Sequence, residues 1–307
     1  MVLLQCIVIY WNSRVAIHYS FLLIVHFGGG GLAYRNLMDL HVHSDNSHDA
    51  HHSVTLVCEK AVAHGLRAIA VTDHCNIIDY RSSKQDIICR QAAFEIKKAK
   101  NVFHGQLIVS CGIELGSPAR DTAAVKDVLR NKFDYVVASV HRLKRRKASF
   151  LHYDMKQKHN HIDQLFPKYL DEIYETVKWN GFDTLAHLTF PLRYFPEEVL
   201  AEFNIEKYNE QLDEILKLLA HNGKALEINT KGSPFLMLGK TYKFHPDFDI
   251  VKRFKELGGE YITVGSDAHS AHDVGRGVAE AYEMAEAAGF KYITLYQHRT
   301  PLPIKFD

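Results

Sequence analysis

Histidine stands out in this 307-residue chain, because its 20 copies outnumber the 18 glycines. Glycine is ordinarily among the commonest residues in proteins. Histidines and carboxylates recur in six short motifs: His41-Val42-His43, Thr72-Asp73-His74, Gly112-Ile113-Glu114, Ser139-Val140-His141, Ala186-His187 and Asp267-Ala268-His269. Imidazole and carboxylate ligands without sulfur favour Zn, Mn or Fe over a structural zinc site. The motifs hold more ligands than one ion can use, so we expect two or three divalent metal ions.

Paired divalent ions have a characteristic chemistry. They activate a bridging hydroxide and stabilise charge on a phosphoryl group during in-line displacement. We therefore expect the nucleophile to be a metal-bridging hydroxide, and we assign no protein nucleophile. Each motif also has an ordinary interpretation. A single histidine is more often a hydrogen-bonded interior residue than a ligand, a His-x-His pair arises by chance, and Asp73-His74 could cap the next loop.

The elements that must position these motifs alternate regularly after residue 36. Near-continuous apolar and β-branched runs are typical of parallel strands that are covered on both faces. Seven such runs lie at Leu37–His43, Arg67–His74, Leu107–Leu115, Tyr135–His141, Thr184–Thr189, Ala225–Thr230 and Tyr261–His269, and an eighth candidate lies at Tyr292–Gln297.

Helical patterns separate these runs, and several of them end at a glycine, as helices often do. They cover Val54–His64, Gln85–Lys100, Ala123–Arg130, Leu165–Trp179, Asn204–His221, Phe248–Leu257 and Ala271–Ala288. Strand and helix alternating over seven or eight units predict an α/β protein with a parallel sheet, most simply closed into a barrel. A doubly wound open sheet is the alternative, although no GxGxxG or Walker sequence follows any strand.

The motif residues lie where the predicted strands end. All strands of a parallel barrel point the same way, so these residues share the carboxyl-end rim, where barrel enzymes keep their chemistry. His41/His43 and Asp267/His269 are i, i+2 pairs, so each pair projects from one side of its strand. Because each candidate recurs at the same phase of the same repeat, the pattern favours a metal site over the ordinary interpretations.

Four features near the motifs need separate interpretations. Cys75 follows His74 but lacks a Cys/His/Asn arrangement, so we expect a buried structural thiol. The basic run at 142–147 is a solvated loop or attracts an anionic substrate. Arg193 lies six residues beyond His187, within reach of a bound phosphate, which a guanidinium suits. His48 lies in a loop, and its role stays open.

Composition excludes several classes of protein. The 37 Lys and Arg against 36 Asp and Glu give a net charge of +1, which selects neither nucleic acid nor an anionic membrane as partner. The 47% of hydrophobic residues suffice for a large core. Five scattered cysteines without a CxxC pair argue against a disulfide framework and suit a reducing cytoplasm. The sequence sets no oligomeric state.

Residues 1–35 differ from the rest of the chain. The segment is apolar and aromatic, but its longest clean runs fall short of the roughly 20 residues of a transmembrane helix. It also matches a signal peptide poorly, because no basic region precedes the apolar stretch. Our hypothesis is that this leader is not native and that the true start lies near Met38, which leaves 36–307 as a single domain.

The motifs, in this order, resemble those of the PHP (polymerase and histidinol phosphatase) superfamily. The opening His43-Ser44-Asp45-Asn46-Ser47-His48-Asp49-Ala50 is most similar to that of the monofunctional histidinol-phosphatase branch, as are the segments His187–Tyr194, Leu226–Thr230 and Gly258–Glu260. The resemblance spans roughly residues 36–300. It implies a distorted (β/α)7 TIM-like barrel with a trinuclear metal centre at the carboxyl rim.

The resemblance also implies a ligand set. His41, His43 and Asp267 would bind the first metal, and Glu114 would bridge it to a second. His141 and His187 would complete the second metal, while Asp49, His74 and His269 would hold the third. Asp49, chosen over His48 from its spacing after His43, comes from the resemblance alone.

The sequence departs from the family at two places where substrate contacts are expected. The stretch 142–161 is longer and more basic than in the shortest members, and Lys231-Gly232-Ser233-Pro234 replaces a sequence like Ser-Gly-Leu-Arg. The resemblance implies a cytoplasmic phosphomonoesterase that hydrolyses L-histidinol phosphate, a small phosphorylated substrate, in histidine biosynthesis. The alternatives are a related phosphoesterase for nucleotides or nucleic-acid ends, and a non-catalytic metal-holding module.

Overall fold

The computed structural model describes residues 34–144, 150, 161–231 and 244–306, and the backbone of two short strands near the start of the chain. The chain divides into two compact units, Met1–Ala33 and Tyr34–Asp307. In the first, β1 (Tyr10–Trp11) pairs antiparallel with β2 (Arg14–Val15). The rest of the predicted leader up to residue 33 lies outside the described residues. Among those described, no helix is both long and apolar enough to span a bilayer.

Seven parallel strands form the core of the second unit, and their order in the sheet follows the chain. They are β3 (Met38–Val42), β4 (Ala68–Val71), β6 (Ile108–Gly116), β7 (Tyr135–Ser139), β8 (Thr184–Leu185), β9 (Ala225–Asn229) and β10 (Ile262–Gly265). Every residue of these strands is buried apart from the half-buried Ile108, as expected of strands covered on both faces.

The sheet closes where β3 meets β10. The His43 amide donates to the Ala268 carbonyl at 2.9 Å, and the Asp267 amide donates to the His41 carbonyl at 2.7 Å. The barrel prediction is therefore confirmed. The doubly wound alternative is wrong, because the strand order never reverses and no topological switch point exists among these seven strands.

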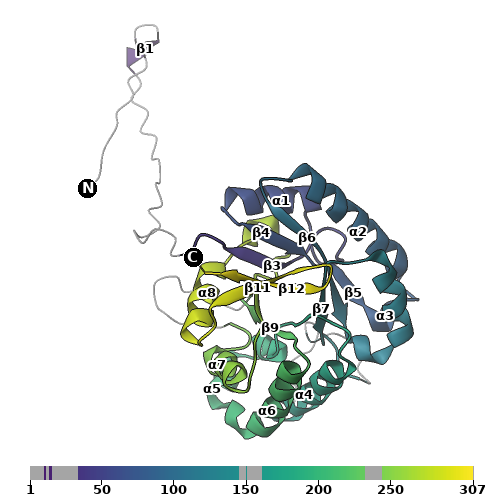
Figure 1. Ribbon diagram of the computed structural model, residues 1–307. Helices are drawn as coiled ribbons and strands as arrows, with labels where there is room; N and C mark the ends of the chain where they lie inside the picture. Colours follow the sequence, from purple (N-terminus) through teal and green to yellow (C-terminus); the bar gives the residue numbers. More distant parts are fainter. Residues whose placement is uncertain are drawn as a thin grey trace. The chain divides into compact units, whose positions relative to one another are not determined.

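Helices surround the strands (Figure 1). They are α1 (Val54–Ala63), α2 (Gln85–Val102), α3 (Thr122–Val128), α4 (Ile162–Trp179), α5 (Glu197–Glu202), α6 (Asn209–His221), α7 (Phe248–Glu256) and α8 (Val278–Ala287). Helix α4 buries Phe166, Tyr169, Leu170 and Ile173 at the 3–4-residue spacing of an amphipathic helix. Side-chain caps begin others: the Asp247 carboxylate accepts from the Ile250 amide at the start of α7.

Several predicted elements are interrupted. The run Arg67–His74 divides into β4 and the short β5 (His74–Asn76), which pairs with the end of β6. The run Thr184–Thr189 keeps regular strand geometry over two residues. The predicted helix Ala271–Ala288 divides into a 3₁₀ turn (Ala271–Asp273) and α8, because Gly275 and Gly277 adopt positive φ between them. Helix α5 was not predicted.

The eighth candidate strand is not part of the barrel. It is β11 (Tyr292–Gln297), which forms an antiparallel hairpin with β12 (Thr300–Lys305). The two residues between them, His298 and Arg299, have φ of 49° and 64°, as a tight two-residue hairpin turn requires. Periodicity identified the strand but could not identify its partner.

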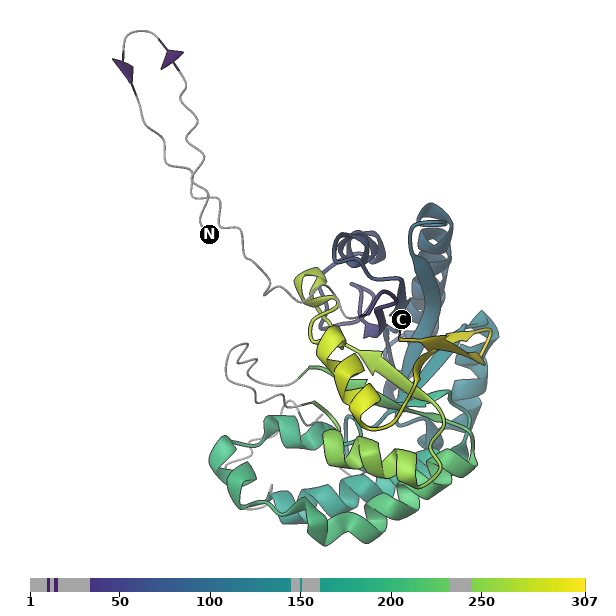
Figure 2. The same cartoon turned by 60° about the vertical axis from the view of Figure 1, so that its left-hand side comes forward.

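The hairpin packs at the amino-terminal end of the barrel, and both views show it in gold against the strands (Figures 1 and 2). Arg299 Nη2 donates to the Asp183 carboxylate at 2.9 Å, just before β8, and its amide donates to the Asp134 carbonyl at 2.8 Å, just before β7. The Tyr296 hydroxyl donates to the Asp183 carbonyl at 3.2 Å. These bonds cover the amino-terminal end of the barrel.

Candidate metal centre

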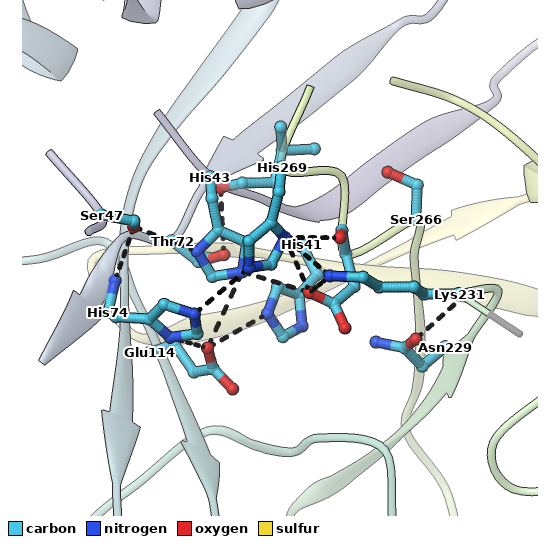
Figure 3. Close-up of polar contacts among 12 residues, drawn as sticks. His41, His43, Ser47, Thr72, His74, Glu114, Asn229, Lys231, Ser266 and His269 are labelled. Carbon is cyan, nitrogen blue, oxygen red and sulfur yellow. Dashed lines mark hydrogen bonds and ion pairs between the residues drawn. The ribbon is translucent and has the colours of Figure 1, made fainter. Parts of the chain in front are cut away.

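The nine predicted ligands meet at the carboxyl end of the barrel. Figure 3 shows His41, His43, His74, Glu114 and His269 close together. His41 lies in β3 and Glu114 in β6, while His74 opens β5. The others follow strand ends by one to four residues, except Asp49, which lies further along the loop after β3: His43, Asp49, His141, His187, Asp267 and His269. The structure thus brings together in one basin the eight residues that the strand-end interpretation selected and Asp49, which the resemblance added.

Glu114 lies at the centre of the cluster. Its Oε1 is 3.1 Å from both His141 Nε2 and His187 Nε2, and its Oε2 is 2.6 Å from His74 Nδ1 and 3.5 Å from His41 Nε2. Burial by itself would raise the pKa of Glu114, but the imidazoles of His141, His74 and His41 outweigh burial and hold the pKa well below 4.5. Each carboxylate oxygen thus faces a different group of imidazoles.

Asp267 defines a second part of the cluster. Its Oδ1 is 3.3 Å from His43 Nε2 and 3.5 Å from His269 Nδ1, and its Oδ2 accepts from Arg193 Nη1 at 3.0 Å. Burial would raise the pKa of Asp267, but Lys231 and the neighbouring imidazoles hold it well below 3.8. The carboxylate is therefore ionised at neutral pH.

Asp49 lies between two histidines at the outer edge of the basin. Its Oδ1 is 3.6 Å from His74 Nε2, and its Oδ2 is 3.3 Å from His269 Nε2. The neighbouring His48 has a side chain that is 70% exposed. Asp49, and not His48, lies in the cluster.

The donor atoms suit divalent cations. Four overlapping groups each place their ligand atoms within 4.8 Å of one another: His41/His43/Asp267, His41/Glu114/His187, His74/Glu114/His141 and His43/His74/His269. In the described part of the chain, His41 Nε2 and His43 Nε2 are buried and have no hydrogen-bond partner. Burial, reinforced by the neighbouring imidazoles, lowers the pKa of His43 well below 6.5. A buried neutral imidazole with a free nitrogen is what a cation requires.

Carboxylates around the cluster fix the orientation of its members, and the motif analysis did not assign them this role. Glu227 in β9 lies 2.6 Å from His41 Nδ1 and accepts from the His187 amide at 2.9 Å. A partner at Nδ1 holds the His41 tautomer whose Nε2 is free for a cation. The available signal was a carboxylate at an interior position of an apolar strand.

Asp39 and Asp73 organise the loops of the rim. Asp39 accepts from the Ser266 amide at 2.8 Å and from the Gly275 amide at 2.7 Å, which ties the loop after β10 to β3. Asp73 accepts from the Ser44 amide and the Ser47 hydroxyl, both at 2.7 Å. Asp73 therefore caps a loop, as its ordinary interpretation proposed, but the loop is the one after β3.

Two residues of the cluster have strained backbones. His187 has a φ of 28° and Asp267 a φ of 53°, in the region that glycine favours. The Glu227 bond to the His187 amide and the bond from the Asp267 amide to His41 hold these conformations. Strain of this kind is concentrated at functional sites.

Arg193 also reaches the cluster. Its Nη1 contacts Asp267 and its Nη2 donates to Asn229 Oδ1 at 2.9 Å, while its side chain is 8% exposed. Its Nε is buried without a hydrogen-bond partner among the described residues. Such a guanidinium retains a donor for an anion.

Two other features near the motifs, Cys75 and the basic run, have structural roles where the chain is described. Cys75 is fully buried, as predicted for a structural thiol. Arg142 donates to Asp79 Oδ1 at 3.2 Å across the rim. Residues 145–147 of the basic run lie outside the described residues.

Residues 39–231 match the family model described as PHP domain, so this chain belongs to that family. Curated relatives include the "Histidinol-phosphatase" of Lactococcus lactis subsp. lactis, 29% identical over 270 residues that cover 84% of this chain and 94% of the relative. The "Probable histidinol-phosphatase" of Thermotoga maritima is 27% identical over 266 residues, which cover 84% of this chain and 95% of the relative. The resemblance inferred from the motifs is confirmed.

One solved structure has a fold similar to that of this chain. The histidinol phosphate phosphatase of Lactococcus lactis, crystallised with zinc, L-histidinol and phosphate, has a TM-score of 0.67 and 25% sequence identity. The match covers 87% of this chain and 99% of that one.

Proposed function

We propose that this protein is a metal-dependent phosphomonoesterase that hydrolyses L-histidinol phosphate to L-histidinol and phosphate in histidine biosynthesis. The observation that carries the proposal is Glu114, whose two oxygens face separate groups of imidazoles in the described basin. A shared carboxylate of this kind suits two cations held close together. The named activities of the relatives and the L-histidinol and phosphate in the similar solved structure support the choice of substrate.

The cofactors that we propose are two or three ions of Zn, Mn or Fe. His41, His43 and Asp267 would hold the first, with Glu114 shared between it and the second. His141 and His187 would complete the second, and Asp49, His74 and His269 the third. When bound, the ions neutralise phosphate oxygens and activate water for attack on phosphorus.

The side chains of the chain itself have separate tasks in this reaction. Glu227 orients His41 and the backbone of His187, so the ligand atoms keep their places without the cost of reorganisation. Arg193 offers its free Nε to a phosphate oxygen, and Asp267 and Asn229 hold the guanidinium in position. We propose Arg193 as a substrate-binding residue on this basis.

Turnover of purified, metal-loaded protein tests this function. We expect kcat/KM for L-histidinol phosphate to exceed that for nucleoside monophosphates by roughly 100-fold or more, because a polar leaving group with its own contacts is strongly discriminated. The reverse ranking would show a nucleotide phosphoesterase. Bound metal without turnover of any phosphate ester would show a metal-holding module.

A matched pair of variants tests the site itself. We expect His141→Ala to lower kcat/KM by roughly 10³-fold with the fold intact, because it removes a proposed ligand beside Glu114. His48→Ala changes an exposed neighbour of the cluster and should retain full activity. Equal activity of the two variants would refute the metal site.

We further propose a cytoplasmic protein, to which the four buried free cysteines 58, 75, 89 and 111 are suited. A separate proposal concerns where the native chain starts relative to residues 1–35. The Tyr34 ring centroid lies 5.4 Å from that of Tyr282, and its hydroxyl donates to Glu286 at 2.7 Å, so a chain that starts at Met38 would lack these contacts. The intact mass of the protein made from its own gene tests where translation starts.

A further inference from the structure

Lys231 lies beside the metal centre, directly after β9. Its backbone amide donates to Asn229 Oδ1 at 3.1 Å, which fixes where the side chain begins. Its Nζ is 2.8 Å from His269 Nδ1 and 3.4 Å from Asp267 Oδ1 (Figure 3). The side chain is 42% exposed, so the ammonium faces both the cluster and the solvent.

The ammonium also faces a cavity of about 320 Å³ at the rim, a volume typical of small-molecule sites. Three proposed ligands line this cavity: Asp49, Asp267 and His269. Its described cationic side chains are Lys231 and Arg276, and Arg276 pairs with Asp273 at 3.2 Å. Lys231 is therefore the cation of this cavity that directly contacts the cluster.

The contact between Lys231 and His269 conflicts with metal binding by His269. His269 Nδ1 is also 2.9 Å from the Asp267 carbonyl, to which it can donate only when it carries a proton. A neutral imidazole that binds a cation through Nε2 carries its proton on Nδ1. In that tautomer Nδ1 donates to the Asp267 carbonyl and cannot accept from Lys231.

We propose that Lys231 is a phosphate-binding residue of this chain, whose ammonium turns from His269 to a phosphate oxygen in the cavity when the cations bind. Four rotatable bonds allow the ammonium this movement. A cation on Asp267 also weakens the second attraction that holds Lys231 in place. The inference rests on the proposed phosphatase function, and it assigns Lys231 to the phosphate and not to the leaving group.

Inorganic phosphate is the probe, because its binding does not depend on which ester is the substrate. We expect Lys231→Met to weaken binding of phosphate to the zinc-loaded protein about 30-fold in titration calorimetry, because a charge-assisted hydrogen bond is lost. Lys231→Arg keeps the charge and should weaken it about threefold or less. The control is Lys252→Met on the exposed face of α7, with phosphate affinity unchanged.

Zinc affinity provides a second measurement. We expect Lys231→Met to bind zinc as tightly as the unsubstituted protein or more tightly, because the lysine competes for His269 and supplies no ligand. Phosphate affinity of Lys231→Met within about twofold of the unsubstituted protein would overturn the proposal. An equal loss in Lys252→Met would also overturn it, by showing a general effect of charge.

The outcome separates this inference from the proposed function. If Lys231→Met weakens phosphate binding while L-histidinol phosphate is not a substrate, the assignment of Lys231 holds and the substrate is wrong. If the zinc-loaded protein does not bind phosphate, the assignment is wrong whatever the turnover.

Discussion

The two ends of the barrel differ in how their buried polar and charged side chains are paired. At the amino-terminal end, the Asp183 carboxylate accepts three bonds from the Arg299 guanidinium, and Asp134 accepts from Lys100 Nζ at 3.1 Å and from the His298 amide at 3.2 Å. At the carboxyl end, His41 Nε2 and His43 Nε2 are buried without hydrogen-bond partners among the described residues. At the amino-terminal end the chain pairs these buried carboxylates with its own groups, whereas at the carboxyl end it leaves these two imidazole nitrogens unpaired.

This difference separates stabilising polar groups from functional ones. Buried polar groups are costly unless they are paired, so an unpaired set indicates a ligand. The hairpin β11–β12 supplies the partners at the amino-terminal end and has no counterpart over the described part of the carboxyl rim. Substitutions at the two ends should therefore have different consequences.

Glu114→Gln should give the largest effect at the open end. Loss of the shared carboxylate removes negative charge that the proposed cations need, so we expect kcat/KM to fall by roughly 10³-fold or more. Turnover of L-histidinol phosphate and metal content measure this. The control is Glu260→Gln, which changes an exposed carboxylate. Full activity of Glu114→Gln would refute the role of Glu114 as the shared carboxylate of the metal centre.

Arg299→Ala should give the opposite result at the closed end. The Asp183 side chain is 5% exposed. Its carboxylate would lose its charged partner and keep the bond from the Val136 amide, so we expect a loss of about 3 kcal/mol in the free energy of unfolding. The kcat/KM of the folded fraction should not change. Denaturant unfolding measures the free energy of unfolding, and steady-state kinetics measure kcat/KM. The control is Arg130→Ala, which breaks an exposed pair with Asp127 and should leave the free energy of unfolding nearly unchanged.

Glu227→Gln tests whether Glu227 is needed to orient the candidate ligands His41 and His187. Because Glu227 holds both His41 and the strained His187 backbone, we expect zinc affinity and kcat/KM to fall by about 10- to 100-fold. Zinc titration of the variant beside Glu260→Gln measures the effect. An unchanged zinc affinity would mean that the ligands hold their orientation without it.

Proton release on metal binding should give the smallest signal. Burial lowers the pKa of His41 and of His74, but the carboxylates of Glu227 and Glu114 raise the first well above 6.5, and those of Glu114 and Asp49 raise the second to about 10. Both histidines are therefore protonated at pH 7 before cations bind. Ligating histidines must be neutral, so zinc binding should release about two protons, measured by calorimetry in buffers of different ionisation enthalpy.

The sign of the pH effect on stability follows from the same shift. A raised His74 pKa stabilises the metal-free protein fully below pH 6.5, and this stabilisation is lost as the pH rises through about 10. The melting temperature of metal-free protein should therefore fall from pH 7 to pH 10. Zinc binding without proton release at pH 7 would contradict the protonated state of both histidines.

The sequence predicted the barrel and the gathering of eight of the nine candidates, because both depend on local periodicity. Each motif ends a strand at the same phase, and parallel strands end at one rim. Asp49 lies outside the strands, so the resemblance to the family was needed to select it over His48. The motif analysis did not assign a role to Glu227, because a carboxylate inside an apolar strand could equally be a structural residue.

The sequence alone determined the repeat of strands and helices, the residue types of the candidate ligands and the membership of the family. The tertiary structure decided which atoms face one another: Glu114 between two groups of imidazoles, Glu227 behind His41, and the hairpin on the amino-terminal end. The physical reason is that periodicity acts over a few residues, whereas these contacts join atoms that are 27 (Glu114 and His141) to 186 (Glu227 and His41) residues apart in the chain. Closure of the barrel and the turn at His298 and Arg299 fix them.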